Sequence, residues 1–481
     1  MMAVSIKIPS PLRRFTEGES VVEVNGQTVE EALENLIGQF SELAPQLYNE
    51  KGELRNFVNL YVRGEDIRYL DAMATKIKDG DEVMIIPSIA GGGETLSGKA
   101  EAATTFDRDE YLRYSRHFSL PEIGLAGQRK LKEASVLIIG AGGLGSPASI
   151  YLAAVGVGHI GLVDYDVVEL SNLQRQILYT SAEIGKPKLT IAKQRLQALN
   201  PNVEITTYAE SLSSANAVSL FRNYDIILDG TDNFPTRYLV NDVCVFQGKP
   251  NVYGSIFRFD GQVSLFEAKE GPCYRCLYEE PPPPGLVPSC AEGGVLGVLP
   301  SVVGSLQATE TIKWITGAGQ TLIGRLLLFD ALAMTFREVK LQKNPDCVVC
   351  GENPTITEPI DYEGFCGVSG LEEMVTVPEL SVQKVKQKLD SGENHLILDV
   401  REKWEWDIAH IKEALFIPMN AIPSRLDELD PSREIVVHCK EGPRAIAMAE
   451  YLIKQGFPDV KNMTGGIKKW TIEVDPSLNL Y

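Results

Sequence analysis

The chain has 481 residues, 44% of them apolar and 23% charged, which is ordinary for globular protein and long enough for three or four domains with separate cores. Its net charge of -19 argues against nucleic acid or an anionic membrane as the main partner. The sequence contains no apolar run of 18 residues and no signal-peptide pattern, so we expect a cytoplasmic protein whose eight cysteines are reduced thiols or metal ligands.

Residues 1–93 predict a small α+β domain with short strands near residues 4–8, 21–24, 57–62 and 83–86. Between the second and third strands, Thr28 and Glu31 predict a capping box. The helix that follows carries apolar side chains at steps of three and four, namely Val29, Ala32, Leu33, Leu36, Ile37 and Phe40. One apolar helix face needs a sheet to cover it, so the strands and helix belong to one domain.

The stretches FVNLYVRGEDIRYL and GDEVMIIPSIAGG resemble the β-grasp, ubiquitin-like sulfur carriers that serve molybdopterin or cysteine synthesis. The resemblance implies a C-terminal Gly-Gly that is activated as a carboxylate and converted to a thiocarboxylate. Here Gly92 and Gly93 lie within the chain, so neither has a free carboxylate. Either a protease cleaves after one of these glycines, or the domain is a docking module and the substrate is a separate carrier. An unrelated domain with a Gly-rich linker is the alternative, and residues 94–105 are small and polar like a linker.

A glycine-rich turn follows the apolar run at residues 136–139, which predicts a buried strand. The turn contains Gly140, Gly142, Gly143 and Gly145, and Pro147 then fits the first turn of a helix. Glycines let backbone N–H groups approach phosphate, and the helix N-terminus favours anions. A second strand delivers Asp164 about 20 residues later, the usual distance for a carboxylate that binds ribose hydroxyls. This pattern predicts nucleotide binding, the alternative being an ordinary tight turn.

The segment after Asp164 separates ATP from NAD. Ser171, Asn172, Leu173 and Arg175 belong to the motif SNLQRQ, and Lys188 follows. Two cations beside a phosphate-binding turn suit a triphosphate, whereas a hydride-transfer enzyme would gain only affinity from them. No Gly-Lys-Ser/Thr ends the turn, so a P-loop is unsupported.

A third strand near residues 224–228 leads into Asp229-Gly230-Thr231-Asp232-Asn233 at the carboxyl edge of the predicted sheet, where open α/β sheets bind ligands. Asp232 is our candidate Mg²⁺ ligand. These motifs together resemble the adenylating enzymes of molybdopterin and thiamine synthesis and their ubiquitin-activating relatives. The resemblance implies a Rossmann-like adenylating domain over residues 106–353, and a homodimer in which Arg116 reaches the partner's active site. It also implies that the residues contacting ATP or Mg²⁺ are Gly143, Asp164, Asn172, Arg175, Lys188, Asp232 and Asn233.

Two Cys-x-x-Cys pairs, Cys273/Cys276 and Cys347/Cys350, offer four thiolates. Four thiolates match tetrahedral Zn²⁺, and a closed set of this kind is structural rather than catalytic. Unliganded thiols or a redox pair are the alternatives.

Three further cysteines lie outside these pairs and before the C-terminal domain. Cys290 follows the proline-rich stretch EEPPPPG, and in the adenylating relatives a cysteine in this loop forms a thioester or acyl disulfide with the carrier; a structural thiol is the alternative. Cys244 lies in an apolar helical context and is expected in the core. Residues 354–374 have the Gly and Pro content of a linker, in which Cys366 has no evident partner.

Residues 375–481 return to an α/β pattern, with strands at residues 395–400 and 435–438. The second strand ends at Cys439, in a loop that reaches a helix after Arg444, so backbone N–H groups, the helix dipole and a cation favour the thiolate. LDVREKWEWDIAHIKEALFIP, this loop and GGIKKW resemble the rhodanese family, whose cysteine carries a persulfide. Four residues separate Cys439 from Arg444, whereas cysteine phosphatases have five, and Ala445 replaces the serine common in rhodaneses.

The sequence therefore predicts a multidomain α/β enzyme that adenylates a ubiquitin-like sulfur carrier and transfers sulfur from Cys439, with Cys290 as a second thiol. ATP, Mg²⁺ and Zn²⁺ are the expected cofactors, and a cysteine desulfurase or thiosulfate is the expected sulfur donor. Molybdopterin or cysteine synthesis is the favoured destination of the sulfur. Ubiquitin-like conjugation through a Cys290 thioester, a non-catalytic scaffold and a nicotinamide oxidoreductase are the alternatives.

Overall fold

The computed structural model describes residues 3–49, 51–55, 58–87, 106–282, 293–367 and 377–480. It divides into two compact units, Met1–Glu101 and Ala102–Tyr481, which are described separately below. Gly92, Gly93, the predicted linker 94–105 and Cys290 lie outside the described residues. Within the described part, no helix combines the length and the apolar content needed to cross a bilayer.

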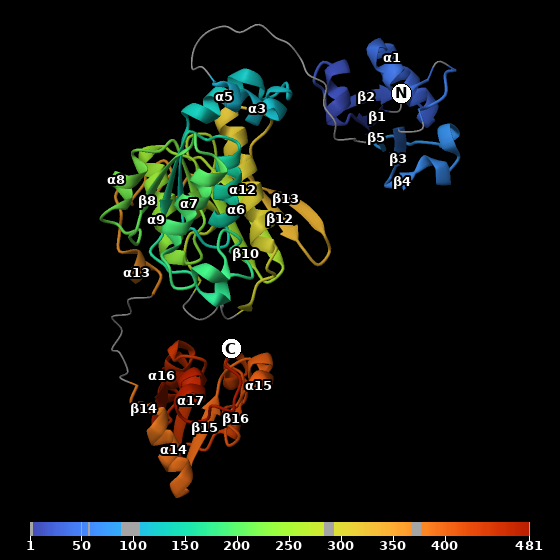
Figure 1. The fold of residues 1–481 in the computed structure, drawn as a ribbon. Coiled ribbons are helices and arrows are strands. Elements are labelled where there is room, and N and C mark those ends of the chain that lie inside the picture. The colour runs from blue at the N-terminus through green and yellow to red at the C-terminus, as the bar shows by residue number, and fades with distance from the viewer. Residues whose placement is uncertain are drawn as a thin grey trace. The chain divides into compact units, whose positions relative to one another are not determined.

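The first unit is a β-grasp fold, as the sequence predicted (Figure 1). Its sheet has the order β2-β1-β5-β3-β4, and β1 pairs with β5 in parallel while the other pairs are antiparallel. The strands are β1 Ala3–Lys7, β2 Val21–Asn25, β3 Val58–Val62, β4 Glu65–Asp66 and β5 Glu82–Pro87. Helix α1, Val29–Gln39, buries the predicted apolar face against this sheet.

The start of α1 differs in one detail from the expected capping box. The Thr28 hydroxyl accepts a hydrogen bond from the Glu31 N–H, as predicted. The Glu31 carboxylate accepts from the N–H of Gln27, at 2.7 Å, rather than from that of Thr28. The Thr28 hydroxyl and the Glu31 carboxylate therefore each accept from a backbone N–H near the start of α1. The N–H that pairs with Glu31 belongs to Gln27, one residue before the expected Thr28.

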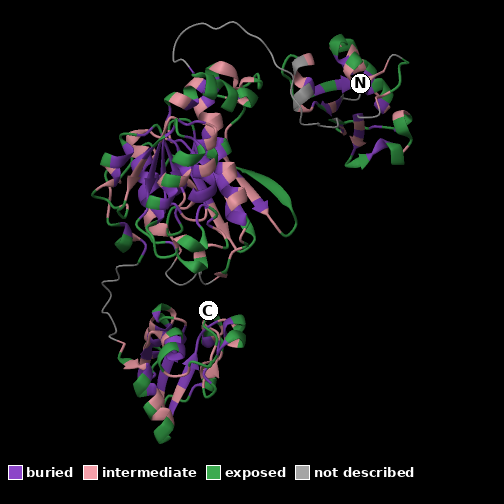
Figure 2. Ribbon diagram, in the orientation of Figure 1, coloured by how far each residue is buried: buried purple, intermediate pink, exposed green. Residues whose placement is uncertain are grey.

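The second unit begins with an eight-stranded mixed sheet of order β13-β12-β11-β10-β9-β6-β7-β8 (Figure 1). The parallel strands are β6 Ser135–Ile139, β7 His159–Val163, β8 Glu204–Tyr208, β9 Ile226–Asp229 and β10 Asn251–Phe257. The antiparallel strands are β11 Asp260–Phe266, β12 Arg325–Asp330 and β13 Thr335–Lys340. The central strands are buried and the outer strand β13 is exposed (Figure 2).

Helices cover both faces of this sheet, which explains the continuous apolar run in β6. Val136 and Ile138 face one core, and Leu137 and Ile139 face the other. The first core is shared with α5 Gly124–Glu133, α6 Gly145–Ala154, α7 Lys188–Leu199 and α12 Leu299–Thr316. The second is shared with α8 Ala217–Phe221, α9 Phe234–Gln247, α10 Tyr274–Leu277 and α13 Tyr362–Phe365. Two short helices, α3 Arg108–Arg113 and α4 Ser115–Phe118, precede the sheet.

Residues 354–367 pack on the central domain, where the sequence predicted the start of a linker. The Tyr362 hydroxyl donates a hydrogen bond to Asp242, and the Ser214 hydroxyl donates to the Ile360 carbonyl. Cys366 is buried in the second core. Gly and Pro content indicates breaks in regular structure but does not indicate burial. The boundary predicted from it, residue 353, therefore comes before the last residues that pack on the central domain.

The C-terminal part of the second unit has its own parallel sheet, of order β14-β18-β17-β15-β16. The strands are β14 Glu379–Ser381, β15 His395–Asp399, β16 Leu415–Phe416, β17 Glu434–His438 and β18 Val460–Thr464. The helices are α14 Val382–Ser391, α15 Lys403–Ile408, α16 Pro443–Lys454 and α17 Gly466–Glu473. The three-part α/β organisation predicted from the sequence is confirmed.

Candidate functional site

The glycine loop between β6 and α6 forms one wall of a pocket at the carboxyl edge of the parallel strands. Gly140 has φ +89°, and a Cβ there would lie 2.9 Å from the Gly230 carbonyl oxygen. A Cβ at Gly145 would lie 1.9 Å from the Gly140 carbonyl oxygen. Both glycines are therefore needed for the turn itself, and Gly140, Gly142 and Gly143 line the pocket.

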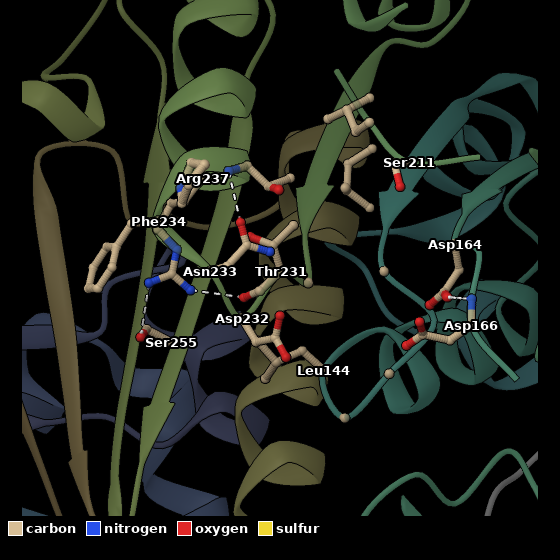
Figure 3. Close-up of a pocket in the computed structure, with 18 of the residues that line it drawn as sticks. Leu144, Asp164, Asp166, Ser211, Thr231, Asp232, Asn233, Phe234, Arg237 and Ser255 are labelled. Carbon is tan, nitrogen blue, oxygen red and sulfur yellow. Dashed lines mark hydrogen bonds between the residues drawn. The ribbon is translucent and has the colours of Figure 1, made fainter. Parts of the chain in front are cut away.

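Asp164 follows β7 and is fixed against this loop (Figure 3). One carboxylate oxygen accepts from the N–H of Ala141 and the other from the N–H of Asp166, each at 2.8 Å. The predicted nucleotide-binding carboxylate thus lies beside the glycine loop with both oxygens oriented by backbone groups.

Lys188 is the first residue of α7 and lines the same pocket. Its side chain is 5% exposed, and its Nζ lies 2.8 Å from Asp166, whose side chain is half exposed. Asp166 was not among the site residues predicted from the sequence. The Asp-x-Asp spacing directly after a strand is the signal that could have identified it.

Only some residues of the SNLQRQ motif line the pocket. Asn172, Arg175 and Gln176 line it, and the Arg175 guanidinium donates to the Ser171 carbonyl. Ser171 and Leu173, which the sequence analysis included among ATP-binding residues, are not among the described pocket-lining residues; Leu173 packs against the apolar core. Gly145 is likewise absent from that lining because it faces the loop backbone.

Gln176 was not predicted but has an unusual environment. It is buried, and its Oε1 has no hydrogen-bond partner among the described residues. A buried acceptor normally has a donor, so this oxygen indicates that the pocket accommodates a ligand that can donate one.

The segment after β9 brings Asp232 to the opposite side of the pocket (Figure 3). Asp229 is fully buried, and its Oδ1 accepts from both the N–H and the hydroxyl of Thr231. Burial raises the pKa of Asp229. The nearby Arg237 guanidinium lowers this pKa, but by less than burial raises it. Asn233 lines the pocket, but its Oδ1 accepts from the N–H of Thr236 and caps α9.

Two buried residues of this region were missed by the sequence analysis. Arg237, on α9, donates to the Thr231 carbonyl at 2.9 Å and to the Ser255 hydroxyl at 3.2 Å. Gln307, on α12, donates to the Asp229 carbonyl at the end of β9 and to the Val252 carbonyl near the start of the neighbouring strand β10. A polar residue inside an apolar helical stretch was the available signal for both.

Arg116 lies on α4 and is exposed. It does not belong to the described lining of this pocket. The single chain therefore does not bring Arg116 to its own site.

The four predicted metal-ligating cysteines do come together, all with sulfur atoms within 4.8 Å of one another. Cys273 Sγ lies 3.7 Å from Cys347 Sγ, and Cys276 Sγ lies 3.3 Å from Cys350 Sγ. Tetrahedral Zn²⁺ with bonds of about 2.3 Å places its sulfur ligands about 3.8 Å apart, so the donor set fits a metal ion of this kind. The N–H of Asn344 also donates to Cys276 Sγ.

We predict that the purified chain holds about one Zn²⁺, and that Cys347→Ser lowers the zinc content to near zero, because three thiolates no longer close the tetrahedron. Metal analysis by mass spectrometry measures this. Cys366→Ser is the matched control, since Cys366 is buried in the same domain, outside the cluster, and burial raises the pKa of its thiol to about 11. A wild-type chain with less than half a zinc would contradict the prediction.

Cys439 lies directly after β17 and is buried. Its Sγ accepts a hydrogen bond from the N–H of Gly442 at 3.1 Å, and α16 begins at Pro443. The Cys439 carbonyl accepts from the N–H of Ile467, at the start of α17. The predicted loop thus presents a backbone donor to the sulfur and is supported by the GGIKKW motif.

Arg444 is held by a residue that the sequence analysis did not assign. Its two terminal nitrogens donate to the Glu405 carboxylate at 2.7 and 2.9 Å. Glu405 also accepts from the N–H of Glu402, closing a capping box at the start of α15. Glu405 therefore offsets part of the Arg444 charge that was expected to favour the Cys439 thiolate, and fixes the orientation of Arg444.

Three protein families match successive parts of the chain. The ThiS family matches residues 6–92, the ThiF family residues 114–349 and the rhodanese-like domain residues 381–473. The probable adenylyltransferase/sulfurtransferase MoeZ of Mycobacterium tuberculosis is 47% identical over 395 residues, covering 80% of this chain and 99% of that protein.

Two animal proteins are similar to this chain, with sequence identities close to that of the mycobacterial protein. Adenylyltransferase and sulfurtransferase MOCS3 of Sus scrofa is 45% identical over 403 residues, covering 78% of this chain and 88% of that protein. The protein of the same name from Drosophila yakuba is 40% identical over 452 residues, covering 91% of this chain and 98% of that protein.

Proposed function

The chain belongs to the family of these adenylyltransferase/sulfurtransferases, and on that premise we propose that it adenylates the C-terminal glycine of a ubiquitin-like sulfur carrier and then converts it to a thiocarboxylate. The observation that carries the proposal is the pocket at the carboxyl edge of β6, β7 and β9. It combines the glycine loop, the buried cation Lys188 and the exposed carboxylate Asp232.

In the first step, a carboxylate oxygen of the carrier attacks the α-phosphorus of ATP. The bond to the bridging oxygen of the β-phosphate breaks, pyrophosphate leaves, and an acyl-adenylate forms. Lys188 and Arg175 balance the charge that develops on the phosphates, and the glycine loop offers backbone N–H groups. Asp164 binds the ribose hydroxyls, and the unpartnered Gln176 Oε1 accepts from the nucleotide.

Asp232 holds Mg²⁺, which supplies charge neutralisation for the leaving pyrophosphate. A carboxylate is the ligand type that Mg²⁺ prefers, and Asp232 is exposed in the pocket rather than paired in the core. No protein nucleophile is needed for this step, which agrees with a pocket lined by charges and backbone groups.

In the second step, the terminal sulfur of a Cys439 persulfide attacks the carbonyl carbon of the acyl-adenylate, and AMP leaves. The product is an acyl disulfide between carrier and Cys439. A second thiol, which we assign to Cys290, attacks Cys439 Sγ, so the carrier leaves as a thiocarboxylate and a Cys290–Cys439 disulfide remains. A thiol reductant then restores both cysteines, and a cysteine desulfurase or thiosulfate supplies the next sulfur.

We also propose that the chain acts in the cytoplasm as a homodimer in which Arg116 serves the partner's pocket. Arg116 lies outside the lining of its own pocket. Exposed apolar side chains support an interface on this domain, since they include Tyr165, Leu170 and Ile177 within a short stretch after β7. The four-cysteine cluster holds structural Zn²⁺ in the proposed enzyme.

The test is exchange of labelled pyrophosphate into ATP by the full chain with Mg²⁺ and a carrier whose C-terminal Gly-Gly is free. We expect exchange well above background with a cognate carrier, and none with the same carrier lacking its last glycine. A peptide of residues 1–93 serves as one carrier, beside separate carriers of the host. Exchange at background with every carrier would indicate a scaffold, whereas adducts on protein lysines that survive reduction would indicate a conjugating enzyme.

A further inference from the structure

The turn that carries Asp232 is fixed from its interior side by two buried residues. Asp229 Oδ1 accepts from the Thr231 N–H at 2.9 Å and from the Thr231 hydroxyl at 2.5 Å. Arg237 Nη2 donates to the Thr231 carbonyl at 2.9 Å. The N–H, the carbonyl and the side chain of Thr231 are thus all engaged, directly before the exposed carboxylate of Asp232.

Arg237 connects this turn to the neighbouring strand. Its Nη1 donates to the Ser255 hydroxyl at 3.2 Å and its Nη2 lies 3.4 Å from the Gly254 carbonyl oxygen, both on β10. Its guanidinium packs over the Tyr253 ring, and its side chain is 9% exposed. Figure 3 shows Arg237 between Ser255 and Thr231, with Asp232 beyond Thr231 at the pocket.

Asp229 and Arg237 also face each other. Arg237 Nε lies 3.7 Å from Asp229 Oδ2, and neither atom has a hydrogen-bond partner among the described residues. A buried ion pair held without its best hydrogen bond is a poor arrangement for stability alone, because desolvation of both charges is costly. The strong hydrogen bonds of both residues go to Thr231 instead.

We propose that Asp229 and Arg237 are positioning residues that hold the Thr231–Asp232 turn so that the Asp232 carboxylate is oriented for Mg²⁺. This rests on the proposed function only in that Asp232 binds the metal. Residues behind a metal ligand fix its orientation, and their substitution commonly weakens metal binding about 10- to 100-fold.

The test is calorimetric titration of ATP into the full chain at graded Mg²⁺ concentrations, with no carrier present. Arg237→Lys keeps a cation opposite Asp229 but cannot reach Thr231 and β10 together. We expect the half-saturating Mg²⁺ concentration to rise about tenfold, while ATP affinity in excess chelator stays within about twofold of the wild-type value. In an Asp232→Asn background, the same Arg237→Lys change should leave the Mg²⁺ requirement unchanged.

Lys132→Gln is the control for a stability loss at an ion pair away from the pocket. Lys132 Nζ lies 2.7 Å from Glu110, whose side chain is 4% exposed, and neither residue lines the pocket. This variant should lower the melting temperature without changing the Mg²⁺ requirement. Ser255→Ala, which removes only one Arg237 contact, is the milder second variant and should give a smaller shift of the same kind.

Two results would overturn the proposal. One is an equal loss of ATP affinity with and without Mg²⁺ in Arg237→Lys, which would make Arg237 a general support of the pocket. The other is a Mg²⁺ shift that persists in the Asp232→Asn background. Failure of the proposed function is distinguishable, because wild-type chain would then bind ATP with Mg²⁺ yet show no carrier-dependent pyrophosphate exchange.

Discussion

Cys439→Ala is expected to lower thiocarboxylate formation about a thousandfold or more, while carrier-dependent pyrophosphate exchange stays at the wild-type rate. The Cys439 sulfur, which accepts from the Gly442 N–H, is the atom that would carry the transferred sulfur, and alanine cannot replace it. Mass spectrometry of the carrier measures the reaction, since the product has one oxygen replaced by sulfur. The split between the two activities follows because adenylation needs no thiol.

Cys244→Ala is the control for this experiment. Cys244 is buried in the central domain, and burial raises the pKa of its thiol well above the usual value, so it should carry no sulfur. Wild-type thiocarboxylate formation is expected from Cys244→Ala. Full sulfur transfer by Cys439→Ala would refute the assigned role of Cys439.

The second large effect is expected for Lys188→Ala, which should lower pyrophosphate exchange about 100- to 1,000-fold. Lys188 is a cation buried at the start of α7, so its removal leaves Asp166 without its partner and adds net negative charge to a site that must bind a triphosphate. Initial rates of exchange at saturating ATP and carrier measure the effect. Loading of Cys439 with sulfur from thiosulfate should be unchanged, because that reaction does not use the nucleotide.

Lys193→Ala provides the matched comparison on the same helix. Lys193 is partly exposed and is not among the described residues that line the pocket. Its replacement should change exchange less than twofold. If Lys188→Ala and Lys193→Ala gave the same rate as wild type, the position of the triphosphate proposed here would be wrong.

The parts of the site that could be predicted from the sequence are those whose chemistry is local. Gly140 and Gly145 are required by the geometry of a single turn, and Asp164 and Asp232 each follow an apolar strand that ends at the ligand-binding edge. The two Cys-x-x-Cys pairs also act locally, because each offers two ligands within one turn. The short strands and one amphipathic helix of residues 1–93 predicted a small α+β domain, and the resemblance of two of its stretches to sulfur carriers identified the β-grasp fold.

What the sequence analysis missed depends on contacts between distant segments. Gln307 on α12 contacts the end of β9 and the start of β10, and Glu405 contacts Arg444 from another helix. Nothing in the residues next to Gln307 or Glu405 specifies these partners. The same reason explains residues 354–367. In the sequence, Tyr362 belongs to a Gly- and Pro-rich stretch typical of a linker, and only the fold shows that its hydroxyl donates to the distant Asp242.

The four-cysteine cluster has a consequence for synthesis of the chain. Its ligands come from residues 273–276 and 347–350, so a ribosome must complete the whole of α12 and the β12–β13 hairpin before the metal can be enclosed. The glycine loop and β6 to β10 are made well before that point. In metal-starved cells, folding of newly made chains should therefore stop after the glycine loop and β6 to β10 have formed. The segment from Cys273 to Cys350 would then stay incompletely folded and exposed to proteases.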